Sequence, residues 1–464
     1  MHLNPTMFRE YDIRGRVDAP DELTPRAIAA LGRGFAAFLM RRGINEVIVG
    51  HDARASSVQA KDLTVEALES SGMHVIEIGA VLTPIFYFSQ YYLKKKGGVM
   101  ITASHNERGW SGFKHAYDYA TTFLPHDVRE LQDIVEKEDF ISGAGGREMR
   151  TDIIEAYTKD ALANTRLVRP LRVVVDAGNG TAGPIVPPIL RRAGCEVIEQ
   201  YTDASETRHH EANPSTVEML NAMADGARRH KANLGLGFDE DGDRLGVVDE
   251  QGTIVWPDRV LMLLARSVLQ KNPGGAIVFD VKSTEGLVED IKAHGGVPVI
   301  WKTGHSYIKA KAKEIGAVLA GERSGHIFFT KEHYGFDDAI YGALKLLEYV
   351  TAESRPLSSL VADLPQYRTS PVWHAPCSDT RKYAVVEELT ARFKKEYGRE
   401  RVIDVNGARV YVDGGWGLVR ASSNVPALVL VFEAKTDEGL ARIESIFREK
   451  LAAFPEVGKD WVSG

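Results

Sequence analysis

The chain has 464 residues, enough for about three or four domains, and its 44% hydrophobic and 26% charged residues are ordinary for a globular protein. The net charge of −7 argues against nucleic acid as a partner, and because no apolar run reaches about 18 residues we expect no membrane span. The N-terminus lacks a secretory signal, and Cys195 and Cys377 are too far apart in sequence to make a disulfide framework, so we expect a cytoplasmic protein with reduced thiols.

Apolar runs that end in polar or glycine-containing turns recur through most of the chain. Residues 47–49, 173–175 and 276–279 are examples, and helical patterns such as 25–42 and 337–349 alternate with them. Strand, turn and helix in repeated succession predict an α/β fold with largely parallel strand pairing.

The spacing of these runs indicates a weak internal repeat of three related units. We expect α/β domains at residues 1–150, 151–255 and 256–368. Candidate linkers are the glycine-rich residues 143–146 and residues 365–371, which begin and end in proline.

Residues 369–464 follow a different pattern. A helical segment at 383–397 precedes strands at 409–412 and 427–432, and a second helix at 437–452 closes the chain. This order predicts a smaller α+β domain, with an antiparallel sheet and helices on one face.

Ser104 lies in a short polar loop, residues 102–106 (TASHN), that follows the apolar strand 98–101. The carboxyl ends of strands are where open α/β sheets present their chemistry. Taken alone, a serine beside a histidine more often caps a helix or hydrogen-bonds a turn than acts as a nucleophile.

Asp239, Asp241 and Asp243 place three carboxylates within five residues, directly after the apolar strand 234–237. Carboxylates this close repel one another unless they are solvated or bind a cation. Together with the hydroxyl of Ser104, such a cluster suggests phosphoryl transfer through a covalent phosphoserine.

An EF-hand is the competing interpretation of the acidic loop, because Glu250 falls at the twelfth loop position. However, Arg244 stands where an EF-hand requires glycine, and strands rather than helices flank the loop. A Mg²⁺ site is favoured, since Mg²⁺ takes few protein carboxylates and completes its shell with water and phosphate oxygens.

Six short stretches occur in a fixed order: residues 8–15 (FREYDIRG), 102–106 (TASHN), 239–244 (DEDGDR), 302–306 (KTGHS), 321–326 (GERSGH) and 420–424 (RASSN). In this order they resemble the α-D-phosphohexomutases, most closely the bacterial phosphomannomutase/phosphoglucomutase branch, and the resemblance runs nearly end to end. It implies three similar mixed- or parallel-sheet α/β domains and a smaller C-terminal α+β domain around a central cleft.

The resemblance implies an isomerase that interconverts hexose 1-phosphate and hexose 6-phosphate. Ser104 would carry a phosphoryl group and act as donor and acceptor in turn, with a hexose 1,6-bisphosphate as intermediate and activator. Mg²⁺ would be held by Asp239, Asp241 and Asp243 together with the phosphorylated Ser104.

The same resemblance suggests acid–base residues. Lys114 matches the family's proposed acid/base lysine by position, although in isolation it is an ordinary surface lysine. His305 is a second acid/base candidate, and a loop histidine that only hydrogen-bonds is equally common. His105 would orient the serine or its phosphate. Arg244 would either pair with an acidic-loop carboxylate or reach the phosphoryl group.

Substrate contacts are implied at both ends of the chain. Glu322 and Ser324 resemble the pair that contacts adjacent sugar hydroxyls, although residues 321–326 could also be a simple turn after the strand 317–320. The remaining residues that the resemblance places in the active site are Tyr11, Arg14, Lys282 and His326, with Arg420, Ser422, Ser423 and Asn424 gripping the non-reacting phosphate.

Four residues depart from the family pattern. Glu107 replaces a usual proline after the serine loop, and Ser111 replaces an asparagine near Lys114. Glu240 adds a carboxylate to the acidic loop, and we expect it to point away from the cation. Arg323 matches neither the methionine typical of the phosphomannomutase/phosphoglucomutase branch nor the glutamine typical of phosphoglucosamine mutases. The choice of sugar therefore rests on overall similarity.

We expect mannose and glucose phosphates as substrates, feeding nucleotide-sugar and surface-polysaccharide synthesis. A phosphoglucosamine mutase is the alternative within the class. A phosphoserine metallophosphatase and a silent sugar-phosphate-binding protein are the alternatives outside it. The expected partner is a small phosphosugar, with no nucleic acid or membrane, and the protein would be a monomer or dimer.

Overall fold

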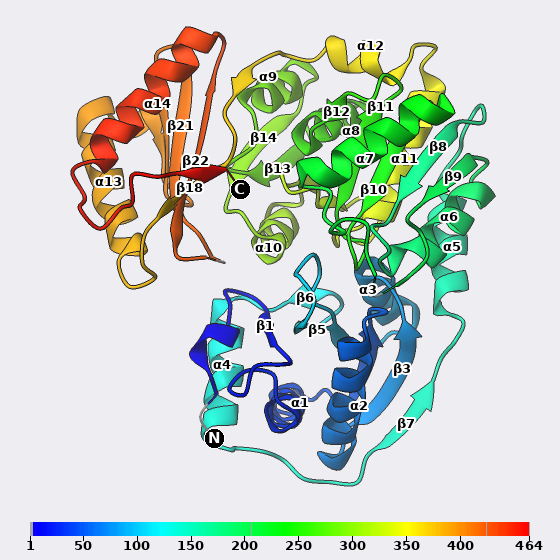
Figure 1. Ribbon diagram of the computed structural model, residues 1–464. Coiled ribbons are helices and arrows are strands. Elements are labelled where there is room, and N and C mark those ends of the chain that lie inside the picture. Colours follow the sequence, from blue (N-terminus) through cyan, green and yellow to red (C-terminus); the bar gives the residue numbers. More distant parts are fainter. Residues whose placement is uncertain (1–2, 206, 424, 464) are drawn as a thin grey trace.

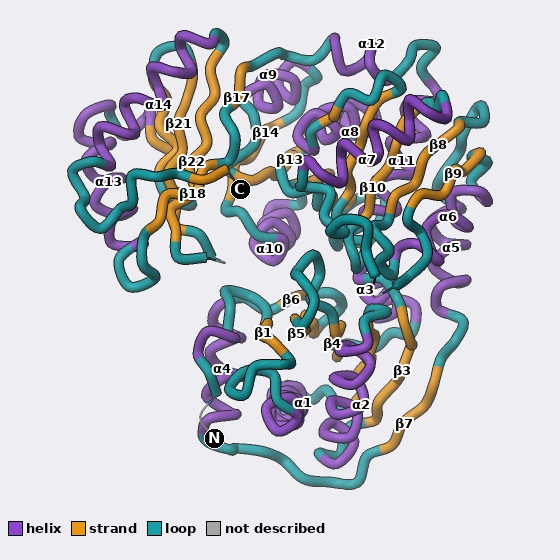
Figure 2. Tube along the Cα trace, in the orientation of Figure 1, coloured by secondary structure: helices purple, strands orange, loops and turns teal. Residues whose placement is uncertain are grey.

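The computed structural model describes residues 3–205, 207–423 and 425–463, so Asn424 of the predicted phosphate-binding loop lies outside the described residues. Four β-sheets follow one another along the chain, each packed against helices (Figure 1). Figure 2 shows helices and strands alternating through most of the chain, as the sequence predicts for an α/β protein. None of the described helices has both the length and the hydropathy that a bilayer span requires.

The first unit comprises β1 (Ile13–Arg16), α1 (Pro25–Met40), β2 (Glu46–His51), α2 (Ala55–Ser70), β3 (His74–Ala80), α3 (Thr83–Tyr92), β4 (Gly97–Ile101), β5 (Trp110–Tyr117), β6 (Thr121–Thr122), α4 (Pro125–Glu136) and β7 (Gly146–Met149). Helix α1 begins at Pro25, whose fixed φ suits a first turn, after Thr24, whose hydroxyl accepts the N–H of Ala27. The sheet order is β1-β5-β4-β2-β3-β7, with β6 beside β5.

The second unit comprises α5 (Ile153–Ala163), β8 (Arg172–Asp176), α6 (Ala182–Arg192), β9 (Glu196–Gln200), α7 (Val217–His230), β10 (Leu234–Phe238), β11 (Leu245–Asp249) and β12 (Ile254–Val255). The third comprises α8 (Pro257–Lys271), β13 (Ala276–Asp280), α9 (Glu285–Ala293), β14 (Val297–Trp301), α10 (His305–Ile315), β15 (Leu319–Gly321), β16 (Ile327–Phe329), α11 (Ala339–Ala352) and α12 (Leu357–Ala362).

The three sheets share one arrangement of four strands. In β3-β2-β4-β5, β9-β8-β10-β11 and β14-β13-β15-β16, the first three strands are parallel and the fourth is antiparallel to the third. The prediction of three similar α/β units is therefore confirmed for the sheets, whereas the boundaries at residues 150, 255 and 368 stay a prediction.

In each of the three units, one loop connects the third and fourth strands of this arrangement. It carries residues 102–109 in the first unit, 239–244 in the second and 322–326 in the third. These are the serine, acidic and sugar loops of the sequence analysis. Each leaves a strand at its carboxyl end, where side chains are free to reach a ligand.

A single apolar cluster joins the first three units. It includes Phe86 from the first, Val175 from the second, and Phe279 and Leu344 from the third, all fully buried. Burying this surface fixes the three sheets relative to one another and so fixes the spacing of their loops.

The C-terminal unit comprises β17 (Arg368–Thr369), β18 (Trp373–Pro376), α13 (Lys382–Tyr397), β19 (Val402–Ile403), β20 (Ala408–Val412), β21 (Gly415–Ala421), β22 (Ala427–Ala434), α14 (Asp437–Leu451) and β23 (Val462–Ser463). Its strands pair only antiparallel, and Leu428, Leu430 and Phe432 of β22 pack with helix residues such as Phe447. The predicted α+β domain with helices on one face is confirmed (Figure 1).

The candidate linkers are more ordered than the sequence suggests. Gly146 begins β7, which pairs in parallel with β3, and Arg368 begins β17, which pairs with β22. Glycine-rich and proline-flanked segments resemble loops in composition, but the first segment leads into an edge strand and the second contains a short strand beside β22. Strand β21 was not among the predicted elements, because glycine and tryptophan at residues 415–417 obscure its alternation.

Candidate active site

Ser104 lies directly after β4, as the sequence predicts, and its side chain is almost fully buried. Its φ of 50° is a left-handed conformation that few residues other than glycine adopt. The Ser104 N–H donates to the Thr102 hydroxyl at 2.8 Å, which helps to fix the turn. Strained backbone at a buried, reactive side chain is a common property of catalytic residues.

Arg54 clamps the serine loop from behind. Its Nη2 donates to the carbonyl oxygens of Ser104 at 2.6 Å and Asn106 at 2.8 Å. Its Nε lies 3.7 Å from a carboxylate oxygen of Glu240 in the acidic loop. One guanidinium therefore links the two loops, a role that nothing in the local sequence around Arg54 indicates.

The acidic loop faces Ser104. Asp239 Oδ1 accepts the N–H groups of Asp243 at 3.0 Å and Arg244 at 3.1 Å, and Asp239 Oδ2 accepts the Ser104 hydroxyl at 3.3 Å. The fully buried Asp239, Asp241 and Asp243 each place an oxygen within 4.8 Å of the others. The carboxyl ends of β4, in the first sheet, and β10, in the second, thus bring the hydroxyl and the carboxylates together, as predicted.

The carboxylate set fits a hard divalent cation. Asp241 Oδ1 and Asp243 Oδ1 are buried and accept no hydrogen bond from any described residue, so each presents a free oxygen. Burial and the charges of Asp243 and Asp241 raise the pKa of Asp239 well above its usual value. A cation among these oxygens would remove that repulsion, which is the behaviour expected of a Mg²⁺-type ligand set.

Lys114 supplies the positive charge in this structure. Its Nζ donates to Asp241 at 2.7 Å and to Asp243 at 2.5 Å. Although burial acts to lower the pKa of Lys114, these two carboxylates raise it above the ordinary value. Lys114 is therefore a buried ammonium in the site and not a solvated surface lysine.

Glu240 turns away from the other three carboxylates, as predicted. Its Oε1 accepts the N–H of Thr181 at 2.9 Å and the Thr181 hydroxyl at 2.6 Å, and its Oε2 pairs with Arg208. The extra carboxylate thus binds residues of the second unit and faces Arg54 of the first.

A cavity of about 220 Å³ opens in front of Ser104. It brings together residues from all four units, including the predicted Tyr11, Arg14, Ser104, His105, Lys114, Arg244, Lys282, His305, Glu322, Ser324, His326, Arg420, Ser422 and Ser423. Arg9, Glu10, Asp12, Thr303 and His374 also line it and were not predicted. The first three belong to the matching stretch 8–15, whereas nothing in the sequence around His374 indicates that it lines the site.

His105 is held against the nucleophile. Its Nδ1 lies 3.0 Å from Ser104 Oγ, and burial followed by the charge of Arg244 lowers its pKa well below the usual value. A neutral imidazole at this distance can accept the serine proton. Arg14 lies beside it, donating to Asp12 at 2.8 Å and to Asn106 at 2.6 Å.

His305 and His326 face one buried carboxylate, Asp337. Their Nδ1 atoms lie 3.6 and 3.5 Å from Asp337 Oδ2. Because His326 Nε2 accepts from Arg244 Nε at 3.2 Å, its proton belongs on Nδ1, and burial lowers its pKa to about 4. Within the described part of the chain neither nitrogen of His305 has a hydrogen-bond partner, so its imidazole is available to a substrate.

The opposite wall is polar and buried. Glu322 Oε1 accepts the N–H of Gly304 at 2.5 Å, and burial, with the nearby charge of Asp280, raises the Glu322 pKa to about 7. Lys282 lies 3.6 Å from Asp280, and burial lowers its pKa. Arg323 donates to the Lys282 carbonyl at 3.1 Å and supports the lysine from outside the cavity.

The C-terminal unit contributes an anion grip. Arg420 is almost fully buried, its Nη2 donates to Ser423 Oγ at 3.5 Å, and its Nε has no hydrogen-bond partner among the residues that the structure describes. Ser422 Oγ accepts the N–H of Val425 at 3.2 Å. A buried guanidinium with an unused donor next to serine hydroxyls suits a phosphate dianion.

Comparison with known proteins agrees with this arrangement. Phosphoglucomutase/phosphomannomutase alpha/beta/alpha domain I matches residues 5–142, domain II matches 154–252, domain III matches 256–367 and the C-terminal domain matches 374–450. A Pseudomonas aeruginosa phosphomannomutase/phosphoglucomutase is 41% identical over 97% of this chain and 96% of its own.

Two further relatives cover the chain equally well. A Neisseria gonorrhoeae phosphoglucomutase is 38% identical over 97% of this chain and 98% of its own. The crystal structure of a Burkholderia thailandensis phosphoglucomutase/phosphomannomutase family protein superposes with a TM-score of 0.90 at 34% identity, covering 97% of this chain and 98% of that one. The chain therefore belongs to the phosphoglucomutase/phosphomannomutase family of the α-D-phosphohexomutases.

Proposed function

We propose that the protein is a phosphohexomutase that interconverts the 1- and 6-phosphates of glucose, mannose or both through phosphorylated Ser104. The observation that carries this proposal is the pairing of two anion sites across one cavity. Ser104 and the acidic loop form one, and Arg420 with its neighbouring serines forms the other, with Glu322 also lining the cavity. A hydrolase has no need of a second phosphate grip.

In the first half-reaction, a sugar hydroxyl would attack the phosphorus of phospho-Ser104. The new bond joins phosphorus to the sugar oxygen, and the bond to Ser104 Oγ breaks. We assign the sugar proton to His305 and assign to Lys114, a buried ammonium, the proton that Ser104 Oγ takes up as it leaves. His105, a neutral imidazole, would accept the serine proton when Ser104 attacks in the second half-reaction. Arg14 and Arg244 would position the transferring group.

The cation would be Mg²⁺, held by Asp239, Asp241 and Asp243 with a phosphoserine oxygen. When bound, it would neutralise charge on the transferring phosphoryl group. Lys114 would then share its carboxylates with the cation, which lowers its pKa and eases loss of its proton.

The bisphosphate formed in this way would turn within the cavity and return its other phosphate to Ser104. Throughout, Arg420, Ser422 and Ser423 would hold whichever phosphate is not reacting. Glu322 and Ser324 would accept from ring hydroxyls, as the resemblance implies. Hexose 1,6-bisphosphate would therefore act as intermediate and activator.

A ³¹P NMR time course tests the reaction. With Mg²⁺, α-glucose 1-phosphate and a trace of glucose 1,6-bisphosphate, we expect a growing 6-phosphate signal without free phosphate. Repeating it with mannose and glucosamine 1-phosphates ranks the sugars. Free phosphate at turnover rates would show a phosphatase instead, and unchanged spectra with all three sugars would show a silent binding protein.

The raised pKa of Glu322 predicts a pH-dependent KM. The ionised carboxylate accepts from two sugar hydroxyls, so affinity should rise as the proton leaves near pH 7, and KM should fall up to about tenfold between about pH 6 and pH 8. Asp280, Lys282 and Arg244 are the charged groups that act on it.

Glu322→Gln is the matched variant for this measurement. It keeps the size of the side chain but removes its ionisation. The second ionisation of the substrate phosphate, near pH 6, affects both proteins equally. We expect its KM profile to be flatter than that of the wild type above about pH 6.5. Identical profiles in the two proteins would contradict the assignment to Glu322.

A further inference from the structure

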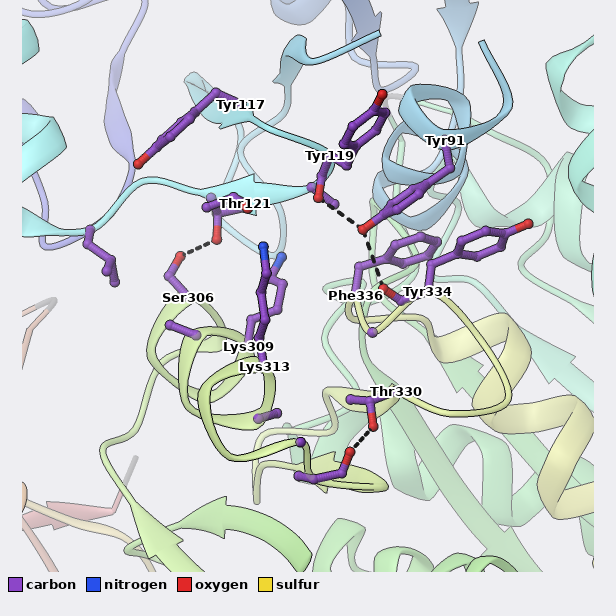
Figure 3. Close-up of a pocket in the computed structure, with 18 of the residues that line it drawn as sticks. Tyr91, Tyr117, Tyr119, Thr121, Ser306, Lys309, Lys313, Thr330, Tyr334 and Phe336 are labelled. Carbon is purple, nitrogen blue, oxygen red and sulfur yellow. Dashed lines mark hydrogen bonds between the residues drawn. The ribbon is translucent and has the colours of Figure 1, made fainter. Parts of the chain in front are cut away.

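A second cavity, of about 360 Å³, lies apart from the catalytic residues between the first and third units (Figure 3). Its walls come from the β5–β6 turn, helices α3 and α10, and the segment 330–336. The size is within the range of small-molecule sites in proteins. Nothing in the proposed reaction uses this cavity.

The cavity is strongly basic. Lys309, Lys313 and Lys331 line it, and none of its lining residues is acidic. Lys309 and Lys313 are one turn apart on α10 and rise from it into the cavity (Figure 3). Lys313 and Lys331 have no ion-pair partner among the described residues. Because Lys309 already pairs with Asp337, the uncompensated charge at the cavity is that of Lys313 and Lys331, and this charge suits an anion.

Aromatic side chains form the facing wall. Tyr91 has its ring centroid 4.8 Å from Tyr334, 5.4 Å from Tyr119 and 6.2 Å from Phe336. Tyr91 and Tyr119 belong to the first unit, whereas Tyr334 and Phe336 belong to the third. Partly exposed tyrosine rings beside ammonium groups suit a ligand with both a flat ring and an anionic group.

The turn that covers this wall is strained. Asp118, Tyr119 and Ala120 have φ values of 48°, 58° and 56°, three successive left-handed residues without a glycine. Tertiary contacts hold them, because Tyr91 donates its hydroxyl proton to the Tyr119 carbonyl at 3.0 Å and Gln90 Oε1 accepts the Ala120 N–H at 3.1 Å. Strain held in this way often marks a ligand site.

The cavity is connected to the catalytic residues through one lysine. Lys309 Nζ donates to Asp337 Oδ1 at 2.9 Å, and Asp337 Oδ2 lies 3.6 Å from His305 Nδ1. Next to His305, Ser306 lines the cavity and shares a hydrogen bond of 2.8 Å with Thr122 of the first unit. A ligand that attracts Lys309 would therefore weaken the hydrogen bond from Lys309 to Asp337, the carboxylate that faces His305.

We propose that this cavity is a regulatory site for a nucleoside phosphate. The base lies against the Tyr91 and Tyr334 rings, and the phosphate pairs with Lys313, Lys331 and Lys309. Drawing the Lys309 ammonium toward the phosphate weakens its bond to Asp337 and lowers turnover. Binding at this site does not depend on the proposed mutase reaction, because its occupancy is measured without turnover.

The binding test uses the full chain and isothermal titration with ADP, GDP, CDP and UDP, with inorganic pyrophosphate as a ligand that lacks the ring. We expect saturable binding of at least one nucleotide and about tenfold or greater loss of affinity in Lys313→Ala. Lys395→Ala removes an exposed lysine from α13 and should bind as the wild type does.

Arg420→Ala separates the two cavities, because it removes the anion grip of the catalytic cavity only. Nucleotide affinity should survive this change. Loss of binding in Arg420→Ala, equal binding in Lys313→Ala, equal binding of pyrophosphate, or no binding of any nucleotide would each overturn the proposal.

The coupling is tested by comparing turnover with and without nucleotide within each variant. We expect a lower kcat at unchanged KM in the wild type and in Lys395→Ala, and a ratio near one in Lys313→Ala. A rise in KM alone would indicate competition in the catalytic cavity, and binding without any change in kcat would overturn the link through Lys309. A protein that binds nucleotide but has no mutase activity would refute the proposed function and leave the site intact.

Discussion

Ser104→Ala is expected to lower mutase turnover by about 10³-fold or more, because the variant has no oxygen to carry the phosphoryl group. Sugar-phosphate binding should persist, since Glu322, Arg420 and the serines beside Arg420 are unchanged. The measurements are kcat from the ³¹P time course and Kd for glucose 1-phosphate by titration. A large loss of kcat with little change in Kd would mark Ser104 as the group that reacts.

Ser89→Ala is the control for this variant. Ser89 is a fully buried serine on α3 whose hydroxyl donates to the Phe86 carbonyl at 2.6 Å, so its loss tests the cost of removing a buried hydroxyl elsewhere. We expect near wild-type turnover from it. Retention of more than a few per cent of activity by Ser104→Ala would exclude the covalent mechanism.

Asp239→Asn should have opposite effects on activity and on metal-free stability. The amide oxygen can still accept the N–H groups of Asp243 and Arg244, and the amide nitrogen can face Ser104 Oγ. Removing one of three clustered, buried charges should raise the free energy of unfolding in chelator by about 1–2 kcal/mol. Turnover should fall by about 10³-fold, because the cation loses a ligand.

Thermal unfolding in EDTA and in Mg²⁺ measures both effects. The wild type should gain stability on adding Mg²⁺ and lose activity in chelator, whereas Asp239→Asn should be more stable in EDTA and respond little to Mg²⁺. Asp133→Asn, on the exposed face of α4, should resemble the wild type. If Asp239→Asn is destabilised in chelator and still gains stability from Mg²⁺, the cation is not held by this carboxylate.

The sequence predicts the reactive loops because short-range patterns identify them. The strand before Ser104 and the strand before Asp239 are apolar runs that end in polar residues, and the carboxyl ends of such strands are where α/β sheets present their chemistry. The predicted contact between the two loops depends on no detail beyond that rule and the family resemblance.

The supporting residues could not be predicted, because they act through tertiary contacts. Arg54 follows β2 and Asp337 precedes α11, and neither stands in a stretch with a distinctive pattern. Their roles appear only once the chain places a guanidinium behind Ser104 and a carboxylate beside His305 and His326. The left-handed backbone of Ser104 is likewise set by its neighbours and not by its residue type.

The walls of the catalytic cavity belong to two separate apolar interiors. The first three units share one apolar cluster, so shifting any of them would break a continuous interior. The C-terminal unit has an interior of its own, drawn from residues 375–457, and meets the third unit through a small seam in which Trp416, Leu418 and Val431 contact Val281. Rotation at that seam would carry Arg420 toward or away from Ser104 while leaving the two large interiors closed, and would give a large intermediate room to turn. Its cost is the bonds that Arg409 donates to the Val281 and Ser283 carbonyls.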